Sequence, residues 1–192
     1  MKIFFRDQKG KLHNHLEYLK SSSVMSYDRS QLKENVTTID LQQKWDKIDF
    51  QVLFDYKIFP ENIMTFFTEW EAEERAMNIG DIIVQQVHLP PIKLLSQKLI
   101  FGVRVKELFD QPDKKGFSYE TIDGNVEKGI STFTIERKDE TVIFKIQTYS
   151  APGSFLIKLV APIFSSPYQA FCTKKALRNV KNSVAPPLTH EE

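Results

Sequence analysis

The chain has 192 residues, of which 41% are hydrophobic, and its 26 basic and 25 acidic side chains give a net charge of +1. This length fits one domain. The balanced charge argues against a general nucleic-acid-binding protein, which needs a basic face to neutralise phosphates. The single cysteine, Cys172, excludes an intrachain disulfide and the zinc sites built from several cysteines.

The sequence predicts a soluble, cytoplasmic protein with no membrane span. No stretch approaches the roughly 20 apolar residues that a transmembrane helix needs. The first ten residues carry charges at Arg6 and Asp7 before any apolar run long enough for a signal peptide.

Residues 1–40 are predicted to form a weakly specified N-terminal arm, because their polar stretches lack a clear apolar period. Removing this arm is expected to leave a folded protein. The main domain is then expected over residues 41–184, followed by a short C-terminal tail at 185–192.

The next two elements are predicted from two different apolar patterns, alternation for a strand and helical spacing for a helix. Alternating apolar residues over 47–59 predict a first strand. Pro60 at a first helical position and the apolar spacing that follows it predict a helix over 60–77. The acidic residues of that helix, including Glu69 and Glu73, are expected on its solvated face.

Five further strands are predicted from alternation and from the turn residues between them, at 80–89, 98–110, 116–123, 129–138 and 141–150. Asp139 and Glu140 are expected to form a tight turn between the last two. In the strand over 98–110, the face carrying Gly102 and Arg104 is expected to be the solvated one. After Gly153 the apolar positions change to helical spacing up to Val180, which predicts one long C-terminal helix.

This order of elements predicts an α+β fold. An antiparallel sheet has one face to bury, and the long C-terminal helix is the large element available to bury it. A curved antiparallel sheet wrapped around such a helix is the helix-grip fold, which leaves space between the two.

Two segments carry a resemblance to a known family, "GFSYETIDGNVEKGISTFTIER" (116–137) and "FKIQTYSAPGSFLIKLVAPIFSSPYQAFCTKKALRNVKN" (144–182). They resemble the domain of unknown function 1990 family, which is similar to the START, Bet v 1 and polyketide-cyclase group. The resemblance implies a helix-grip fold and ligand binding, and it implies no activity. The chain departs from the family pattern at residues 120–122, Asn125 and Ile130, where relatives usually have Gly-Thr-Leu, His and Glu.

The concave face of the sheet and the inward face of the helix are predicted to line a ligand site. The expected lining is Phe101, Val103, Phe117, Tyr119, Phe133, Phe144, Ile146, Thr148, Ile163, Phe164, Tyr168 and Phe171. None of these residues carries a charge, and an unpaired charge is costly away from water. We therefore expect a neutral hydrophobic or lipid-like ligand, held by hydrogen bonds from Tyr119 or Thr148, and no cofactor.

Other chemistry has weaker support in the sequence. His13 and His15 have no third metal ligand nearby, so no metal site is predicted. Cys172 lies among apolar residues and is expected to be an inert thiol. His88 is expected at a strand end, near solvent or bonded to a backbone group. Two alternatives stay open: an enzyme of the cyclase, dehydratase or hydrolase type, and an interaction module with a closed cavity. The oligomeric state is also left open.

Overall fold

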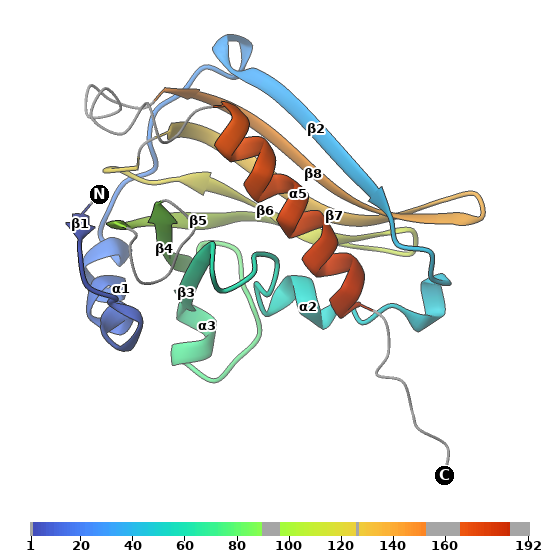
Figure 1. Ribbon diagram of the computed structural model, residues 1–192, viewed down its shortest axis with the longest axis horizontal. Helices are drawn as coiled ribbons and strands as arrows, with labels where there is room; N and C mark the ends of the chain where they lie inside the picture. Colours follow the sequence, from blue (N-terminus) through green and yellow to red (C-terminus); the bar gives the residue numbers. More distant parts are fainter. Residues whose placement is uncertain (1, 90–96, 126, 153–165, 185–192) are drawn as a thin grey trace.

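The computed structural model of the chain describes residues 2–89, 97–125, 127–152 and 166–184 (Figure 1). Within these residues, eight strands form one antiparallel sheet in the order β2-β8-β7-β6-β5-β4-β3, with β1 beside β5. Helix α5 lies across one face of the sheet (Figure 1), which confirms the predicted α+β helix-grip architecture.

The strands are β1 (Lys2–Phe4), β2 (Lys33–Asp40), β3 (Met64–Thr68), β4 (Ile82–Leu89), β5 (Gln97–Gln111), β6 (Lys114–Thr121), β7 (Glu127–Lys138) and β8 (Thr141–Pro152). The α-helices are α1 (Leu12–Lys20), α2 (Gln51–Phe54), α3 (Glu69–Ala72) and α5 (Ser166–Ser183). None of the described helices is both long and apolar enough to cross a membrane.

The five strands predicted from alternation are confirmed as β4 to β8. β7 and β8 pair in continuous register from Glu127 opposite Pro152 to Lys138 opposite Thr141. The tight turn at residues 139–140 is confirmed, and Asp139 adopts a φ of 52° there. The register of β5 against β6 shifts between Val105 and Glu107. Such a bulge bends and twists a strand, which suits a sheet that curves around a helix.

The two elements predicted between residues 47 and 77 are wrong. A short helix, α2, stands where a strand was expected, and β3 followed by the short α3 stands where a helix was expected. In the first segment the buried residues Val52, Leu53 and Tyr56 follow helical spacing. In the second, the apolar run Ile63–Phe67 is nearly continuous, and such a run fits a strand covered on both faces as well as a helix.

The N-terminal 40 residues are not a weakly specified arm. All eight residues of β2 pair with β8. Leu12, Leu16 and Leu19 of α1 are buried against the sheet, where they form a second core with Ile82, Val84, Ile100 and Ile122. Leucines at i, i+4 and i+7 lie on one helical face, so the three positions carry a signal that the polar residues between them obscure.

The face of β5 expected to be solvated lies under α1. A Cβ atom added at Gly102 would lie 2.7 Å from Ile122 Cδ1 and 3.1 Å from Leu19 Cδ1, so glycine allows the helix to approach closely. Arg104 Nη2 donates to the carbonyl oxygens of Lys20 at 3.1 Å and Ser22 at 2.9 Å. Basic side chains stabilise helix C-termini in this way, so Arg104 holds the end of α1 on the sheet.

The acidic residues after β3 are also not simply solvated. Lys20 Nζ lies 3.2 Å from Glu69 Oε1 and 3.3 Å from Glu73 Oε1. Glu69 Oε2 accepts a 2.9 Å hydrogen bond from the backbone N–H of Ile82. These contacts join α1, α3 and β4 on the face of the sheet away from α5.

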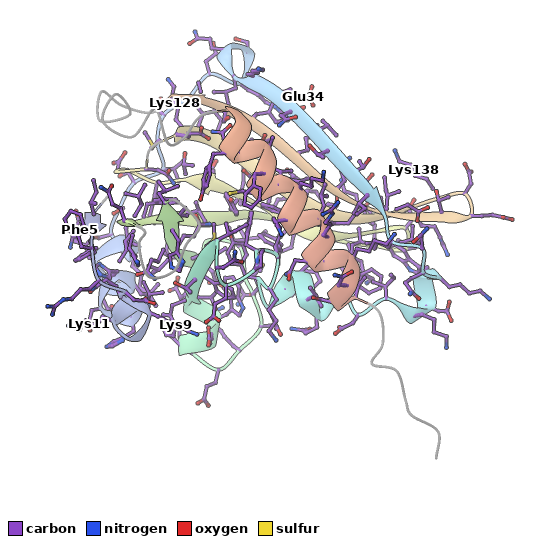
Figure 2. The ribbon with its side chains drawn as sticks, viewed as in Figure 1. Phe5, Lys9, Lys11, Glu34, Lys128 and Lys138 are labelled. Carbon is purple, nitrogen blue, oxygen red and sulfur yellow. The ribbon has the colours of Figure 1, made fainter. Side chains whose placement is uncertain are left out.

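Helix α5 packs on the sheet through residues spaced four apart. Ala176 and Val180, with Val184 directly after the helix, are fully buried in the main core, and Tyr168 and Cys172 are half-buried against it. Tyr56 and Phe59, from the segment between α2 and β3, fill part of the space beneath the helix, and their rings meet the rings of β6 and β7. The charged side chains labelled in Figure 2 lie around the periphery.

Candidate functional site

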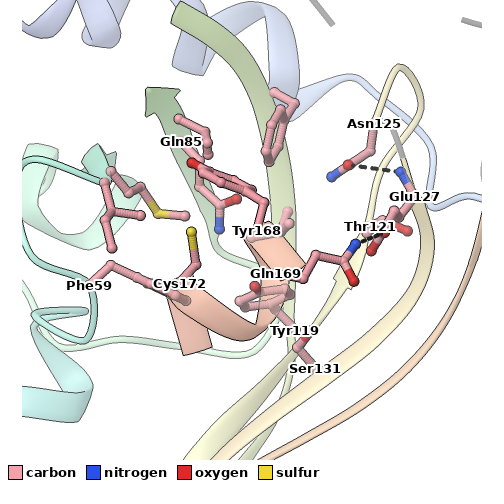
Figure 3. A pocket seen from close by; sticks show the side chains of 15 residues that line it. Phe59, Gln85, Tyr119, Thr121, Asn125, Glu127, Ser131, Tyr168, Gln169 and Cys172 are labelled. Carbon is pink, nitrogen blue, oxygen red and sulfur yellow. Dashed lines mark hydrogen bonds between the residues drawn. The ribbon is translucent and has the colours of Figure 1, made fainter. Parts of the chain in front are cut away.

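A cavity of about 160 Å3 lies where the first turns of α5 meet the concave face of the sheet (Figure 3). One part of its wall is apolar and another part is polar. The apolar residues are Phe59, Ile63, Met64, Val87, Phe101 and Val103. The remaining lining residues are Gln85, Tyr119, Thr121, Asn125, Glu127, Ser131, Tyr168, Gln169 and Cys172.

Four of the predicted lining residues contact this cavity: Phe101, Val103, Tyr119 and Tyr168. The first three come from β5 and β6, and Tyr168 comes from the first turn of α5. Period-two alternation therefore assigned the correct face of these strands.

Four other predicted residues belong to the packed core instead. Phe117, Phe133, Phe144 and Ile146 are at most 6% exposed. Phe117 and Phe133 stack with ring centroids 5.5 Å apart, and the Tyr119 ring lies 5.4 Å from that of Phe133. These positions face α5 as expected, but neighbouring rings fill the space that they border.

The other expected lining residues differ in position. Thr148 is half-buried on β8, opposite Ser131 in the register, and does not line the cavity. The placement of Phe171 is corrected: its ring is 41% exposed and lies 5.7 Å from Lys175 Nζ. The buried stripe of α5 repeats every four residues through Cys172, which turns the neighbouring Phe171 toward solvent. Ile163 and Phe164 lie outside the described residues.

The polar part of the wall was not predicted, except for Tyr119 and Tyr168. Glu127 and Ser131 lie on β7 in alternation with Phe133, whose inward direction was predicted. Counting back by two from Phe133 would have assigned both to the cavity face. Glu127 was instead expected in the connection before β7, because Gly124 and Gly129 suggested a longer turn.

Glu127 is held by residues on both sides of the cavity. Gln169 Nε2 of α5 donates to Glu127 Oε1, and the backbone N–H of Glu127 donates to Asn125 Oδ1 at 3.4 Å (Figure 3). Gly129, between Glu127 and Ser131, contributes no side chain, and its N–H donates to Thr121 Oγ1 at 3.0 Å. The carboxyl group is therefore held at the cavity wall by α5, and the backbone of Glu127 is held by Asn125.

Tyr119 is supported by a buried polar pair. Gln85 Nε2 donates a 2.6 Å hydrogen bond to the hydroxyl of Tyr56, which is fully buried. Tyr56, Gln85 and Ser131 present polar groups to the Tyr119 hydroxyl. Because buried polar groups are stable only when they have partners, this pair fixes the hydroxyl at the boundary between the packed rings and the cavity.

All four ionisable residues that line the cavity among the described residues have raised pKa values. Burial is the largest cause for Tyr119, Glu127, Tyr168 and Cys172. The Gln169 hydrogen bond partly opposes the rise in the pKa of Glu127. Desolvation disfavours the charged form of an acid, so this environment favours the neutral form of each group.

Replacing Glu127 with glutamine is expected to stabilise the protein at neutral pH. Folding raises the Glu127 pKa, so the native state is stable with a neutral carboxyl and loses stability as pH rises through that value. The Glu127→Gln variant has no such loss. The gain should therefore appear above the folded pKa and vanish below about pH 4, the range in which a free Glu is also protonated.

Urea unfolding of both proteins between pH 3 and pH 8 measures this difference. Glu107→Gln, the same change at an exposed position on β5, controls for the loss of one negative charge. The quantity compared is the stability of Glu127→Gln minus that of the unmodified protein. A smaller value of this difference at pH 7 than at pH 3 would contradict the expected neutral state.

The remaining candidate residues do not reach the cavity or do not form a site. His88 is fully buried rather than near solvent, and its side chain lies on the opposite face of β4 from Gln85 and Val87. His13 and His15 lie on helix α1, where a spacing of two places side chains on different sides. Among the described residues, no three His, Cys, Asp or Glu side chains are placed to hold a metal ion.

The fold is shared with solved structures of very different sequence. The ginseng major latex-like protein 151 from Panax ginseng aligns with 80% of this chain and 98% of its own, at 9% identity and a TM-score of 0.56. A hypothetical protein from Helicobacter pylori aligns with 84% of this chain and 95% of its own, at 9% identity and a TM-score of 0.50. A protein from Arthrobacter aurescens aligns with 88% and 98%, at 10% identity and a TM-score of 0.50. At these identities the likeness shows the helix-grip fold alone.

The family is shown by the sequence. Residues 26–179 match the family described as a domain of unknown function, DUF1990, and the match covers well over half of the chain. The protein therefore belongs to this family, as the two segments resembling it predicted. No curated protein sequence matches the chain.

Proposed function

We propose that the protein binds a small, neutral and largely hydrophobic molecule in the cavity between α5 and the sheet. The observation that carries this proposal is the division of the cavity wall into an apolar part and a short polar part. Small-molecule sites typically combine an apolar lining with a few placed polar groups that orient the ligand.

The volume narrows the size of the ligand. Sites for drug-sized molecules measure about 300–1,000 Å3, whereas this cavity measures about 160 Å3. An engineered apolar cavity of about 150 Å3 holds benzene. We therefore narrow the expected ligand from a lipid to a molecule built on a single ring or a short branched chain.

The charges at the site support a neutral ligand. No Lys, Arg or His is among the described residues that line the cavity, so an anion would have no cationic partner there. The apolar wall includes Met64 and Phe59, whose side chains adapt well to rings. An unpaired charge in this environment would be costly.

Filling the cavity should abolish binding of a ring-sized probe. Ethylbenzene is expected to bind the unmodified protein with one-to-one stoichiometry and to raise its thermal unfolding midpoint, because a ligand that binds only the native state stabilises it. Val103→Phe adds a ring at the apolar wall and should remove both effects. Isothermal titration calorimetry and thermal unfolding measure them.

The matched control is Val36→Phe, the same substitution at a 48% exposed position on the edge strand β2. It should leave ethylbenzene binding unchanged. Unchanged binding to a folded Val103→Phe variant would place the ligand elsewhere and overturn the proposal.

A further inference from the structure

Three polar side chains converge on one side of the cavity from two neighbouring strands. Tyr119 of β6 and Ser131 of β7 are opposite each other in the register, and Glu127 lies four residues before Ser131 on the same face of β7. Figure 3 shows all three on the wall around Gln169. The apolar residues Phe101 and Val103 complete the lining from β5.

We propose that this polar group is a binding site for the carbonyl oxygen of a small ketone, aldehyde or ester, with the Tyr119 hydroxyl and the Glu127 carboxyl as the two donors. The inference rests on the proposed function, because it names the chemical class of the ligand that the same cavity takes. The ring or alkyl part of the ligand would lie against Phe101, Val103 and Met64.

The geometry leaves a proton of Glu127 available for a ligand. Gln169 Nε2 donates to Glu127 Oε1, so that oxygen acts as an acceptor and the proton of the neutral acid belongs on Oε2. Asn125 accepts from the backbone of Glu127 and adds no charge. A protonated carboxyl has one O–H donor, and Glu127 is one of the residues that line the cavity.

The Tyr119 hydroxyl supplies the second proton, on the same wall of the cavity as Glu127. The Gln85 amide donates to the Tyr56 hydroxyl, and this hydroxyl stays neutral beside Tyr119, because burial raises the pKa of both phenols. A hydroxyl and a protonated carboxyl on the wall of one cavity suit an oxygen with two lone pairs, which a carbonyl group has.

The described residues that share the cavity with Glu127 favour its neutral form. They include Gln169, Tyr168 and Cys172 of α5, Tyr119 of β6 and Gln85 of β4, and none of these is a cation. Lys128 is the next residue of β7, and alternation places its side chain on the other face of the sheet. Burial raises the pKa of Glu127 in this setting.

Other ligand classes fit this wall less well. A carboxylate ligand would meet a second carboxyl group without a cation between them, and like charges at a shared site repel. An amine would need ionised Glu127, the form that burial disfavours. A hydrocarbon would leave the polar groups of the wall without a ligand partner, which costs affinity.

Three probes of similar shape test the proposal on the full chain: acetophenone, ethylbenzene and 1-phenylethylamine. Calorimetric titration at pH 5 to 9 should show acetophenone binding about 2- to 12-fold more tightly than ethylbenzene, the range for one ordinary hydrogen bond. This preference should fall as pH rises through the Glu127 pKa, because the carboxylate has no proton to donate.

Two variants identify the donors. Glu127→Gln keeps a neutral donor, so it should keep the preference for acetophenone and remove its pH dependence. Tyr119→Phe removes one donor and should reduce the preference while leaving ethylbenzene affinity unchanged. Unfolding curves recorded for both variants confirm that each is folded before binding is compared.

Each alternative outcome is distinct. Equal affinity for acetophenone and ethylbenzene would overturn the carbonyl site while the proposed apolar binding function stands. Tightest binding of 1-phenylethylamine, lost in the Glu127→Gln variant, would show an ionised Glu127 and also overturn it. Binding of none of the three probes would overturn the proposed function itself.

Discussion

Truncating Phe133 to alanine is expected to lower the free energy of unfolding by about 3–5 kcal/mol, the usual cost for a fully buried phenylalanine. Phe133 is 1% exposed. Its ring lies 5.5 Å from Phe117, 5.4 Å from Tyr119 and 6.2 Å from Phe59, measured between centroids. Such aromatic contacts add to the effect of burial alone. Urea denaturation at equilibrium measures the change.

Phe171→Ala on α5 is the control, because the 41% exposed ring has little contact to lose. Its effect should stay within about 0.5 kcal/mol, as for most surface substitutions. A large loss at Phe171 would mean that α5 is rotated about its axis relative to the sheet. A small loss at Phe133 would mean that its ring is not packed in the core.

The sheet was predictable from the sequence because its strands are long and alternate clearly. Over β6 and β7, inward residues such as Phe117 and Phe133 alternate with polar ones, and a sustained period of two indicates a strand with one buried face. The turn at Asp139 adds a local signal that does not depend on the rest of the fold.

The segment from Trp45 to Trp70 could not be predicted in the same way. Its residues are buried from several directions at once. Ile63 and Thr65 point to one side of the chain and Met64 points to the other, yet all three are at most 8% exposed. When both faces of a strand are covered, alternation disappears, and tertiary contacts decide between helix and strand. Helix α1 was missed for a related reason, because its three leucines are separated by polar residues.

The candidate site could be predicted only in part, for the same reason. The direction of each side chain on a strand is a local property, so Phe101, Val103 and Tyr119 could be assigned to the concave face. Whether the space in front of a residue is filled depends on other segments. Tyr56 and Phe59, from a segment predicted as a strand, cover Phe117 and Phe133. This packing leaves the space beside Tyr119 and Glu127 as the cavity.

Deleting residues 1–40 is expected to abolish cooperative unfolding, in contrast to the expectation from the sequence alone. The deletion removes β2 from the edge of the sheet and exposes the apolar residues Ile82, Val84, Ile100 and Ile122. Each of the three α1 leucines in that core is worth about 2–5 kcal/mol on the scale of leucine-to-alanine substitutions. Together they match the whole stability of a typical domain, about 5–15 kcal/mol.

A finer version of this test uses single substitutions on α1. Leu16 is 2% exposed, so Leu16→Ala should lower the free energy of unfolding by about 2–5 kcal/mol. Tyr18 is 63% exposed on the same helix, so Tyr18→Ala should lower the free energy of unfolding by no more than about 0.5 kcal/mol. Because both variants gain the same residue with good helix propensity, the difference between them reports the packing of α1 on the sheet. A truncated protein lacking residues 1–40 that unfolds with the same midpoint as the full chain would show that the second core adds nothing to stability.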